Sequence, residues 1–424
     1  MNLSKQHALK MFGNNRKVIE NYFSLTTLQL LNSLFILVIY PYLIRTLGIT
    51  QYGLYVFAFS IANYVNVIVT FGYNIHGVRE VSLNRDNNAN LSKILSNLLS
   101  SQVYLFLTCF IMLIVTVYFI PFTRENYWLY VVCGLSAFSP VLFPTWFFQG
   151  MEQMKYITVL QLGIKLFSLP FILFLVKTPQ DLLLYAIINT ASTLIGSFLA
   201  ILLIKYHFKI DFFLKPVREF KLYMKEALPF FWGSAASVIK MQSTAFFAGT
   251  FISMASVAYY DLASKIVLLI ATLLSNINNA FYPKLVKEQN PNIVRKALMG
   301  LAFICVVTVL FLFIGGKYIV FLLGGKLMIE SYSIMNILSA IIPCWVIVGG
   351  IQLFILIPLK RYKYVAISQT MAFVIYMILT IIGSVIYKNI FWIAAAMSVS
   401  GVAELCYNFV IVRKHNLLSK LKPV

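Results

Sequence analysis

Ionisable side chains within long apolar stretches are the residues best placed to do chemistry in this sequence. A charge at the centre of a membrane helix costs about 2.5–3.5 kcal/mol on insertion scales, so such residues usually line a polar pathway or pair with one another. Two of the five found here are acidic and three are basic. They are Lys165, Lys240, Asp261, Lys265 and Glu404.

Lys165 and Lys240 lie too deep in their apolar stretches to reach water easily. Lys165 follows Lys155 by ten residues, which is about 15 Å along a helix. Lys240 follows Glu226 by fourteen residues. We predict that both lysines line a shielded polar cavity. The alternative is internal pairing, with Glu404 as a partner, without any ligand contact.

Asp261 and Lys265 are four residues apart, so they share one face of a helix. One interpretation is a pair that only neutralises its own charge. The other is that Asp261 takes up a proton and releases Lys265, which would couple the protein to a proton gradient. With Glu404, Asp261 is therefore a candidate ion-coupling residue.

The amino-acid composition indicates that these residues lie in a membrane protein. Of 424 residues, 60% are hydrophobic and 11% charged, and the mean hydropathy is +0.85. A soluble domain carries about 25% charged residues. Apolar runs of about 20 residues without strict alternation indicate membrane helices rather than barrel strands. The basic N-terminus precedes a long apolar span and is expected to be an uncleaved anchor.

We predict an all-α polytopic membrane protein with twelve transmembrane helices. The stretch Tyr318–Leu323 is too short to span and is expected at the interface. The twelve spans are Asn21–Ile44, Gly53–Asn74, Ile94–Ile120, Trp128–Phe148, Tyr156–Val176, Leu182–Ile204, Leu228–Phe251, Val257–Phe281, Ala297–Gly315, Ile334–Ile357, Val365–Tyr387 and Ile390–Val412.

The positions of Lys and Arg orient these spans, because cytoplasmic loops are enriched in both residues. With both termini in the cytoplasm, 25 of the 34 Lys and Arg residues lie inside and 6 outside. The net charge of +21 is thus explained by loop orientation, and we predict no nucleic-acid partner. The longest inside connection divides the spans six and six. We therefore expect an N-terminal bundle (1–204), a cytoplasmic linker (205–226) and a C-terminal bundle (227–424), both bundles having six helices.

Several segments resemble the polysaccharide-repeat-unit flippase family, whose best-known members export O-antigen units. The first-half segments are YLIRTLGITQYG (Tyr42–Gly53), FGYNIHGVREVS (Phe71–Ser82) and FPTWFFQGMEQMKYIT (Phe143–Thr158). The second half adds YYDLASKI (Tyr259–Ile266) and FYPKL (Phe281–Leu285). The family belongs to a superfamily that also contains multidrug exporters and the lipid II flippase.

The resemblance implies a carrier that moves an undecaprenyl-pyrophosphate-linked oligosaccharide, an O-antigen or capsule repeat unit, across the bacterial cytoplasmic membrane by alternating access. Its partners would be this lipid-linked substrate, membrane lipid, a polysaccharide polymerase and a chain-length regulator. A diphosphate needs positive charge, and sugars suit amides and aromatic rings. The predicted substrate-binding residues are Lys165, Lys240, Lys265, Arg45, Gln161 and Trp146; Arg79 and Glu80 are the predicted inner gate.

Two other classes of function remain as alternatives. A cation-coupled multidrug exporter would share the architecture, although three buried lysines against two acids suit an anionic substrate better. A membrane polymerase or ligase needs a large outside loop with catalytic residues. The longest outside connection here, Gly316–Ser333, has no histidine and one acid, Glu330. We expect no enzyme activity, no catalytic residues, no cofactor and no metal site, since the histidines and cysteines are scattered.

Overall fold

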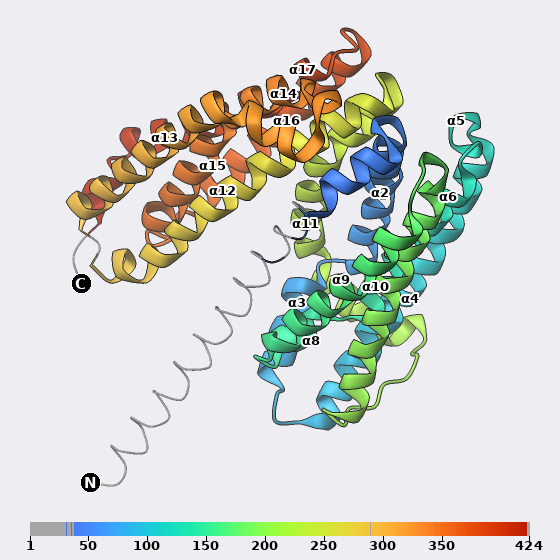
Figure 1. Cartoon of the computed structure of the whole chain (residues 1–424). Helices are drawn as coiled ribbons and strands as arrows, with labels where there is room; N and C mark the ends of the chain where they lie inside the picture. Colours follow the sequence, from blue (N-terminus) through green and yellow to red (C-terminus); the bar gives the residue numbers. More distant parts are fainter. Residues whose placement is uncertain (1–30, 32–34, 36–37, 289, 422–424) are drawn as a thin grey trace, which may run out of the picture. The chain divides into compact units, whose positions relative to one another are not determined.

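Every regular element in the described part of the chain is helical (Figure 1). The computed structural model describes residues 31, 35, 38–288 and 290–421. Residues 38–47 are helical. The α-helices that follow are α2 (Ile49–Thr70), α3 (Tyr73–Leu83), α4 (Asn88–Phe119), α5 (Pro121–Arg124), α6 (Tyr127–Leu135), α7 (Ser139–Leu142), α8 (Thr145–Gly150), α9 (Met154–Leu175), α10 (Leu182–Tyr206), α11 (Val217–Phe251), α12 (Met254–Glu288), α13 (Pro291–Gly324), α14 (Glu330–Ser339), α15 (Ile341–Ile351), α16 (Tyr362–Val385) and α17 (Ile390–Lys414).

Short helical turns of other kinds connect some of these helices. Four are 3₁₀ turns, and a π-helical segment continues α15 directly. They are η1 (Ser136–Phe138), η2 (Pro179–Asp181), η3 (Lys326–Met328), η5 (Leu418–Lys420) and the π-helical η4 (Gln352–Leu356).

Ten helical stretches of the described residues are long and apolar enough to cross a membrane. Each coincides with one of the twelve predicted spans. The first predicted span, Asn21–Ile44, lies largely outside the described residues. The seventh, Leu228–Phe251, falls within α11 and is not among the ten. The multi-pass helical class is thus confirmed, whereas twelve spans and cytoplasmic termini stay predictions.

One predicted helix end is wrong. We expected a span to end at Gly315 and Tyr318–Leu323 to form a separate interfacial piece, but α13 continues without a break to Gly324. Neither glycine at 315–316 breaks the helix. Gly316 instead lets α14 approach, because a Cβ atom there would lie 2.2 Å from the Met335 side chain.

The chain forms two compact units that do not follow the chain order strictly. Of the described residues, unit 1 contains those up to Leu47 and residues 58–242, and unit 2 contains residues 48–57 and those from Ser243 onward. Consequently α2 and α11 each contribute residues to both units. The predicted bundles 1–204 and 227–424, with their linker 205–226, stay a prediction.

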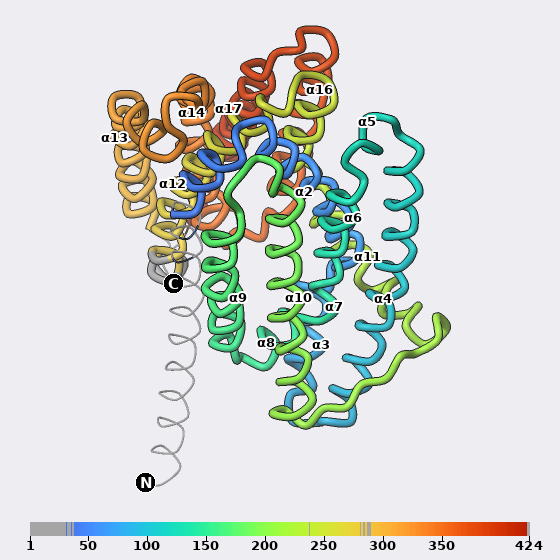
Figure 2. The backbone as a smooth tube through the Cα atoms, turned by 45° about the vertical axis from the view of Figure 1, so that its right-hand side comes forward, coloured from blue at the N-terminus to red at the C-terminus, as the bar shows by residue number. Residues whose placement is uncertain are grey.

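Unit 1 is a bundle in which α10 packs against α6, α7 and α9, while α4 packs against α6 (Figure 2). Its core gathers apolar residues of α4 around the aromatic residues of α8. Trp146, Phe147 and Phe148 are all buried there, next to Leu95 and Leu98. This core fixes α8, which carries part of the site described below.

Unit 2 is built on α12, which packs against α14 and α15, and on the antiparallel neighbours α16 and α17. Helix α17 also contacts α14 and α15. Tyr376 of α16 is buried and shares hydrogen bonds with the hydroxyls of Ser243 and Thr244, at 3.0 and 2.5 Å. These hydroxyls tie the C-terminal part of α11 to α16.

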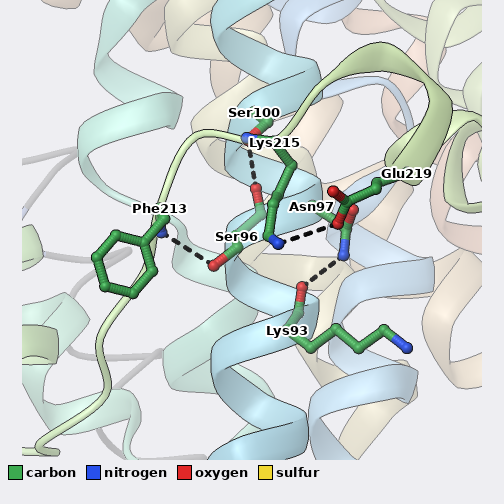
Figure 3. Close-up of polar contacts among 7 residues, drawn as sticks. All are labelled: Lys93, Ser96, Asn97, Ser100, Phe213, Lys215 and Glu219. Carbon is green, nitrogen blue, oxygen red and sulfur yellow. Dashed lines mark hydrogen bonds and ion pairs between the residues drawn. The ribbon is translucent and has the colours of Figure 1, made fainter.

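The non-helical connection 207–216 is held against α4 by buried serine hydroxyls (Figure 3). The backbone N–H of Phe213 donates to Ser96 Oγ at 3.0 Å, and that of Lys215 donates to Ser100 Oγ at 2.7 Å. Because Ser96 and Ser100 are four residues apart, both lie on one face of α4. The connection therefore has a defined path along α4, and α11 begins directly after it.

Candidate functional site

Two of the family-like sequence segments pack against each other in unit 1. Helix α3 carries FGYNIHGVREVS, and α8 with the following turn carries FPTWFFQGMEQMKYIT. Gly77 allows the contact, because a Cβ atom there would lie 2.9 Å from the ring of Trp146. Arg85 follows α3 in the chain, and Glu152 follows α8. The Arg85 guanidinium lies 2.7 Å from the Glu152 carboxylate, and its Nε donates to the carbonyl of Gly150.

A polar cavity of about 210 Å³ lies beside this contact. Its lining comes from α2, α3, α4, α7, α8, α9 and the turn between α7 and α8. Every lining side chain is uncharged, and eight are amides or hydroxyls or carry the indole N–H. The lining residues are Asn66, Thr70, Asn74, Gln102, Ser139, Pro140, Phe143, Thr145, Trp146 and Gln161.

The break between α2 and α3 places three polar side chains of the cavity. Asn66 and Thr70 are four residues apart on α2 and share a face. Phe71 and Gly72 then adopt positive φ angles of 42° and 73°, which end α2 and start α3. Glycine accepts this conformation without steric cost. Asn74, in the first turn of α3, thereby returns to the same cavity.

Two lining groups are buried polar atoms without a hydrogen-bond partner. They are Oε1 of Gln102, an acceptor, and Nε1 of Trp146, a donor. Gln102 is 1% exposed and Trp146 is 2% exposed. Buried polar groups are almost always paired, so orphaned ones need a reason. A ligand rich in hydroxyl groups would satisfy both, because a hydroxyl both donates and accepts.

The structure brings together two of the predicted substrate-binding residues, Trp146 and Gln161, in this cavity. Lys165 follows Gln161 by one helical turn on the same face of α9. Its ammonium lies 5.0 Å from the centre of the Phe35 ring. A positive charge therefore lies one turn beyond the uncharged cavity.

In unit 2, Asp261 and Lys265 of α12 form the predicted ion pair. Tyr52 joins this pair as a third residue. The Lys265 ammonium lies 2.7 Å from Oδ2 of Asp261 and donates to the Tyr52 hydroxyl at 2.9 Å. Tyr52 in turn donates to the same carboxylate oxygen at 2.9 Å. The exposed fractions are 16% for the Asp261 side chain and 33% for that of Lys265. Tyr52 belongs to the segment YLIRTLGITQYG, so this network joins two family-like segments.

The other predicted residues lie elsewhere. Arg45 is exposed, Lys240 is half-buried in α11, and Glu404 is buried in α17 at 7% exposure. Of the predicted gate, Arg79 is exposed and Glu80 is half-buried, both on α3. Their roles stay predictions.

Sequence reasoning missed Asn66, Thr70, Asn74 and Gln102. A signal for them was available, because each is a polar residue within or beside a predicted apolar span. They carry no charge, and an uncharged side chain in a membrane helix is less costly than a lysine, so the charge pattern that identifies the lysines does not identify these residues. Gln102 also stands in a run with Ser100 and Ser101, which is unusual at the centre of an apolar span.

Comparison with solved structures shows that the fold is similar to that of a lipid II flippase and of a multidrug transporter. The structure described as "Lipid II flippase MurJ, inward closed conformation" superposes with a TM-score of 0.70 at 16% identity, covering 95% of this chain and 90% of that one. An inward-facing multidrug resistance MATE family transporter of the MOP superfamily gives 0.63 at 13% identity, covering 91% and 95%.

The family follows from the sequence comparisons. Residues 18–289, more than half of the chain, match the family described as "Polysaccharide biosynthesis protein", and the chain belongs to this family. Two curated relatives carry the name "Putative O-antigen transporter". That of Escherichia coli (strain K12) is 22% identical over 324 residues, 76% of each chain. That of Shigella dysenteriae is 27% identical over 265 residues, 60% of this chain and 64% of its own. The resemblance to polysaccharide flippases is thus confirmed.

Proposed function

We propose that this protein moves an undecaprenyl-pyrophosphate-linked oligosaccharide, an O-antigen or capsule repeat unit, across the bacterial cytoplasmic membrane by alternating access. The observation that carries the proposal is the uncharged polar cavity of unit 1, with its unpaired Gln102 and Trp146 atoms. Family membership and the names of the two relatives support the same substrate class.

The size and lining of the cavity suit part of a sugar chain. Sites for drug-sized ligands measure roughly 300–1,000 Å³, so a cavity of about 210 Å³ holds only a portion of a large ligand, about one sugar ring. Amide groups bind sugar hydroxyls as donors and acceptors, and the indole of Trp146 offers both a ring face and an N–H. The rest of the repeat unit would lie outside this cavity.

The pyrophosphate needs cations close to the sugar site. Lys165 meets this need because it shares the α9 face of Gln161. In this proposal Lys165 binds the diphosphate, and Lys240, Lys265 and Arg45 provide further positive charge along the path. Arg79 and Glu80 act at the inner gate.

The Tyr52–Asp261–Lys265 network supplies a route for ion coupling. Protonation of Asp261 would remove the charge that holds Lys265, leaving the ammonium for an anionic ligand. Tyr52 would keep Lys265 near its place through the 2.9 Å hydrogen bond. Glu404 is a second candidate for proton uptake, since it is a buried acid. The partners in this proposal are membrane lipid, a polysaccharide polymerase and a chain-length regulator.

Deletion of the gene in its native host tests the proposal. Surface polysaccharide and lipid-linked repeat units are measured together, with the membrane leaflet of the units assigned by an impermeant sugar-modifying reagent. We expect the surface polymer to disappear and complete repeat units to collect on the inner leaflet. Single unpolymerised units at the surface would indicate a polymerase, and a normal surface with new drug sensitivity would indicate a multidrug exporter. Either result would overturn the proposal.

A further inference from the structure

His76 of α3 is buried in unit 1 with an unpaired ring nitrogen. It is 1% exposed, and its Nε2 makes no hydrogen bond. The nearest carboxylate oxygen, Oε2 of Glu226, is 3.8 Å away, beyond hydrogen-bond distance. A buried imidazole nitrogen without a partner costs free energy. The position of this nitrogen beside a carboxylate therefore needs an explanation.

The fold places His76 and Glu226 opposite each other by a close helix contact. At Gly72, a Cβ atom would lie 2.5 Å from the backbone nitrogen of Phe231, so the turn that starts α3 approaches the backbone of α11 closely. His76 lies one turn after Gly72 on α3, and Glu226 lies about one turn before Phe231 on α11. The ring of Phe71 stacks on that of Phe231 at 4.8 Å and fixes this crossing.

Glu80 completes a cluster of three potential metal ligands. It follows His76 by four residues on α3 and so shares its face. The ligand atoms of His76, Glu80 and Glu226 all lie within 4.8 Å of one another. In the part of the chain that the structure describes, no other group of three His, Cys, Asp or Glu side chains meets this criterion.

We propose that His76, Glu80 and Glu226 bind a divalent transition-metal ion of the zinc type. Two carboxylates balance the double charge, and an imidazole nitrogen favours zinc-like ions over Mg²⁺ and Ca²⁺. Zinc–ligand distances of about 2.1 Å separate tetrahedral ligand atoms by about 3.4 Å. The side chain of Glu226 is 52% exposed and can swing inward to close the remaining gap. Water takes the fourth position.

The neighbouring groups are compatible with this ion. The ring of Tyr223 lies edge-on to His76 at 6.3 Å and covers the site from α11. Arg79 adds a positive charge near His76, but its side chain is exposed and extends to solvent. A bound ion would cross-link α3, which carries the predicted gate, to the N-terminal part of α11. This inference does not rest on the proposed transport function.

Titration of the purified full chain with Co²⁺ tests the site, with a cleavable affinity tag other than polyhistidine. The visible absorption of four-coordinate Co²⁺ reports binding, and displacement by Zn²⁺ gives its affinity. We expect one saturable site per chain. Glu226→Gln and His76→Gln should weaken Zn²⁺ binding by about 100-fold. Glu226→His restores a ligand and should bind within about 10-fold of the natural protein.

Glu219→Gln is the matched control, because Glu219 lies on the same helix but pairs with Lys215 at 3.0 Å. It should bind metal as the natural protein does. Glu226 lies at the surface, so its substitution leaves folding intact even if His76→Gln does not. Absence of a saturable site in the natural protein, or equal affinity in Glu226→Gln and Glu219→Gln, would overturn the proposal.

Discussion

Gln102 shows why single polar residues matter in this bundle. Its amide is buried on α4 and lines the polar cavity, yet Oε1 has no hydrogen-bond partner. In membrane proteins, hydrogen bonds between helices contribute only about 0.6 kcal/mol on average, so a buried amide whose acceptor is unpaired contributes little to stability. Its presence is better explained by a ligand than by folding.

Gln102→Leu separates these two roles. The substitution removes an unpaired buried acceptor and keeps the volume similar, so thermal stability in detergent should stay the same or rise. Transport of the lipid-linked sugar should fall about 10-fold, since a bidentate amide contact is lost. Gln369→Leu, on an exposed position of α16 outside the cavity, is the control and should leave transport unchanged. A loss of stability with normal transport would show that Gln102 is structural.

The carboxyl group of Asp261 leads to a prediction about the pH dependence of transport. In the proposed coupling, protonation of its carboxyl would break the 2.7 Å pair with Lys265, so the transport rate of the natural protein should depend on pH. Asn at this position cannot take up a proton. Asp261→Asn should therefore weaken the pH dependence of transport, measured in membrane vesicles. An unchanged pH profile would remove Asp261 from the coupling mechanism.

At the scale of elements, glycines set how closely the helices approach. Among the described glycines, Gly53 makes the closest approach, because a Cβ atom there would lie 1.8 Å from the carbonyl oxygen of Met254. That atom is backbone and cannot rotate away. Gly53 therefore fixes the start of α2 against the start of α12 and keeps Tyr52 beside Asp261.

Gly53→Ala should force α2 and α12 apart and destabilise the protein by about 1–3 kcal/mol. The contact of Tyr52 with Asp261 should weaken with it. Gly163→Ala is a matched control on α9, where no atom lies within 4 Å of the added Cβ. Alanine should stabilise that helix by about 0.5–1 kcal/mol. Thermal unfolding in detergent measures both changes; equal effects would contradict the contact geometry.

The sequence predicts the helices better than it predicts the cavity. Apolar length locates the spans because lipid forces every backbone group into internal hydrogen bonds. The sequence predicts the ends of helices less accurately, as the continuation of α13 past Gly315 shows. The cavity brings together residues that are distant in sequence, such as Gln102 and Trp146, and it depends on the close approach of Gly77 to the Trp146 ring. The cluster of His76, Glu80 and Glu226 was missed for the same reason, since Glu226 is 150 residues from His76.

At the scale of the whole molecule, loop charge predicts the orientation of every span. Both termini should be cytoplasmic, because 25 of 34 Lys and Arg residues then lie inside. Alkaline phosphatase fused to the C-terminus should be inactive, while a fluorescent protein at the same place should fluoresce. A fusion within 325–329, between α13 and α14, should give the opposite result. Active phosphatase at the C-terminus would contradict the predicted orientation.

Translocation in proteoliposomes tests the central claim most directly. The purified protein is reconstituted with undecaprenyl-pyrophosphate-linked oligosaccharide, and the fraction that crosses the bilayer is measured with an impermeant sugar-modifying enzyme. The proposal predicts movement that requires the protein, slows about 10-fold in Gln102→Leu, and continues at the normal rate in Gln369→Leu. Equal rates in the three proteins would contradict the assignment of the cavity, and no movement above protein-free vesicles would contradict the flippase function itself.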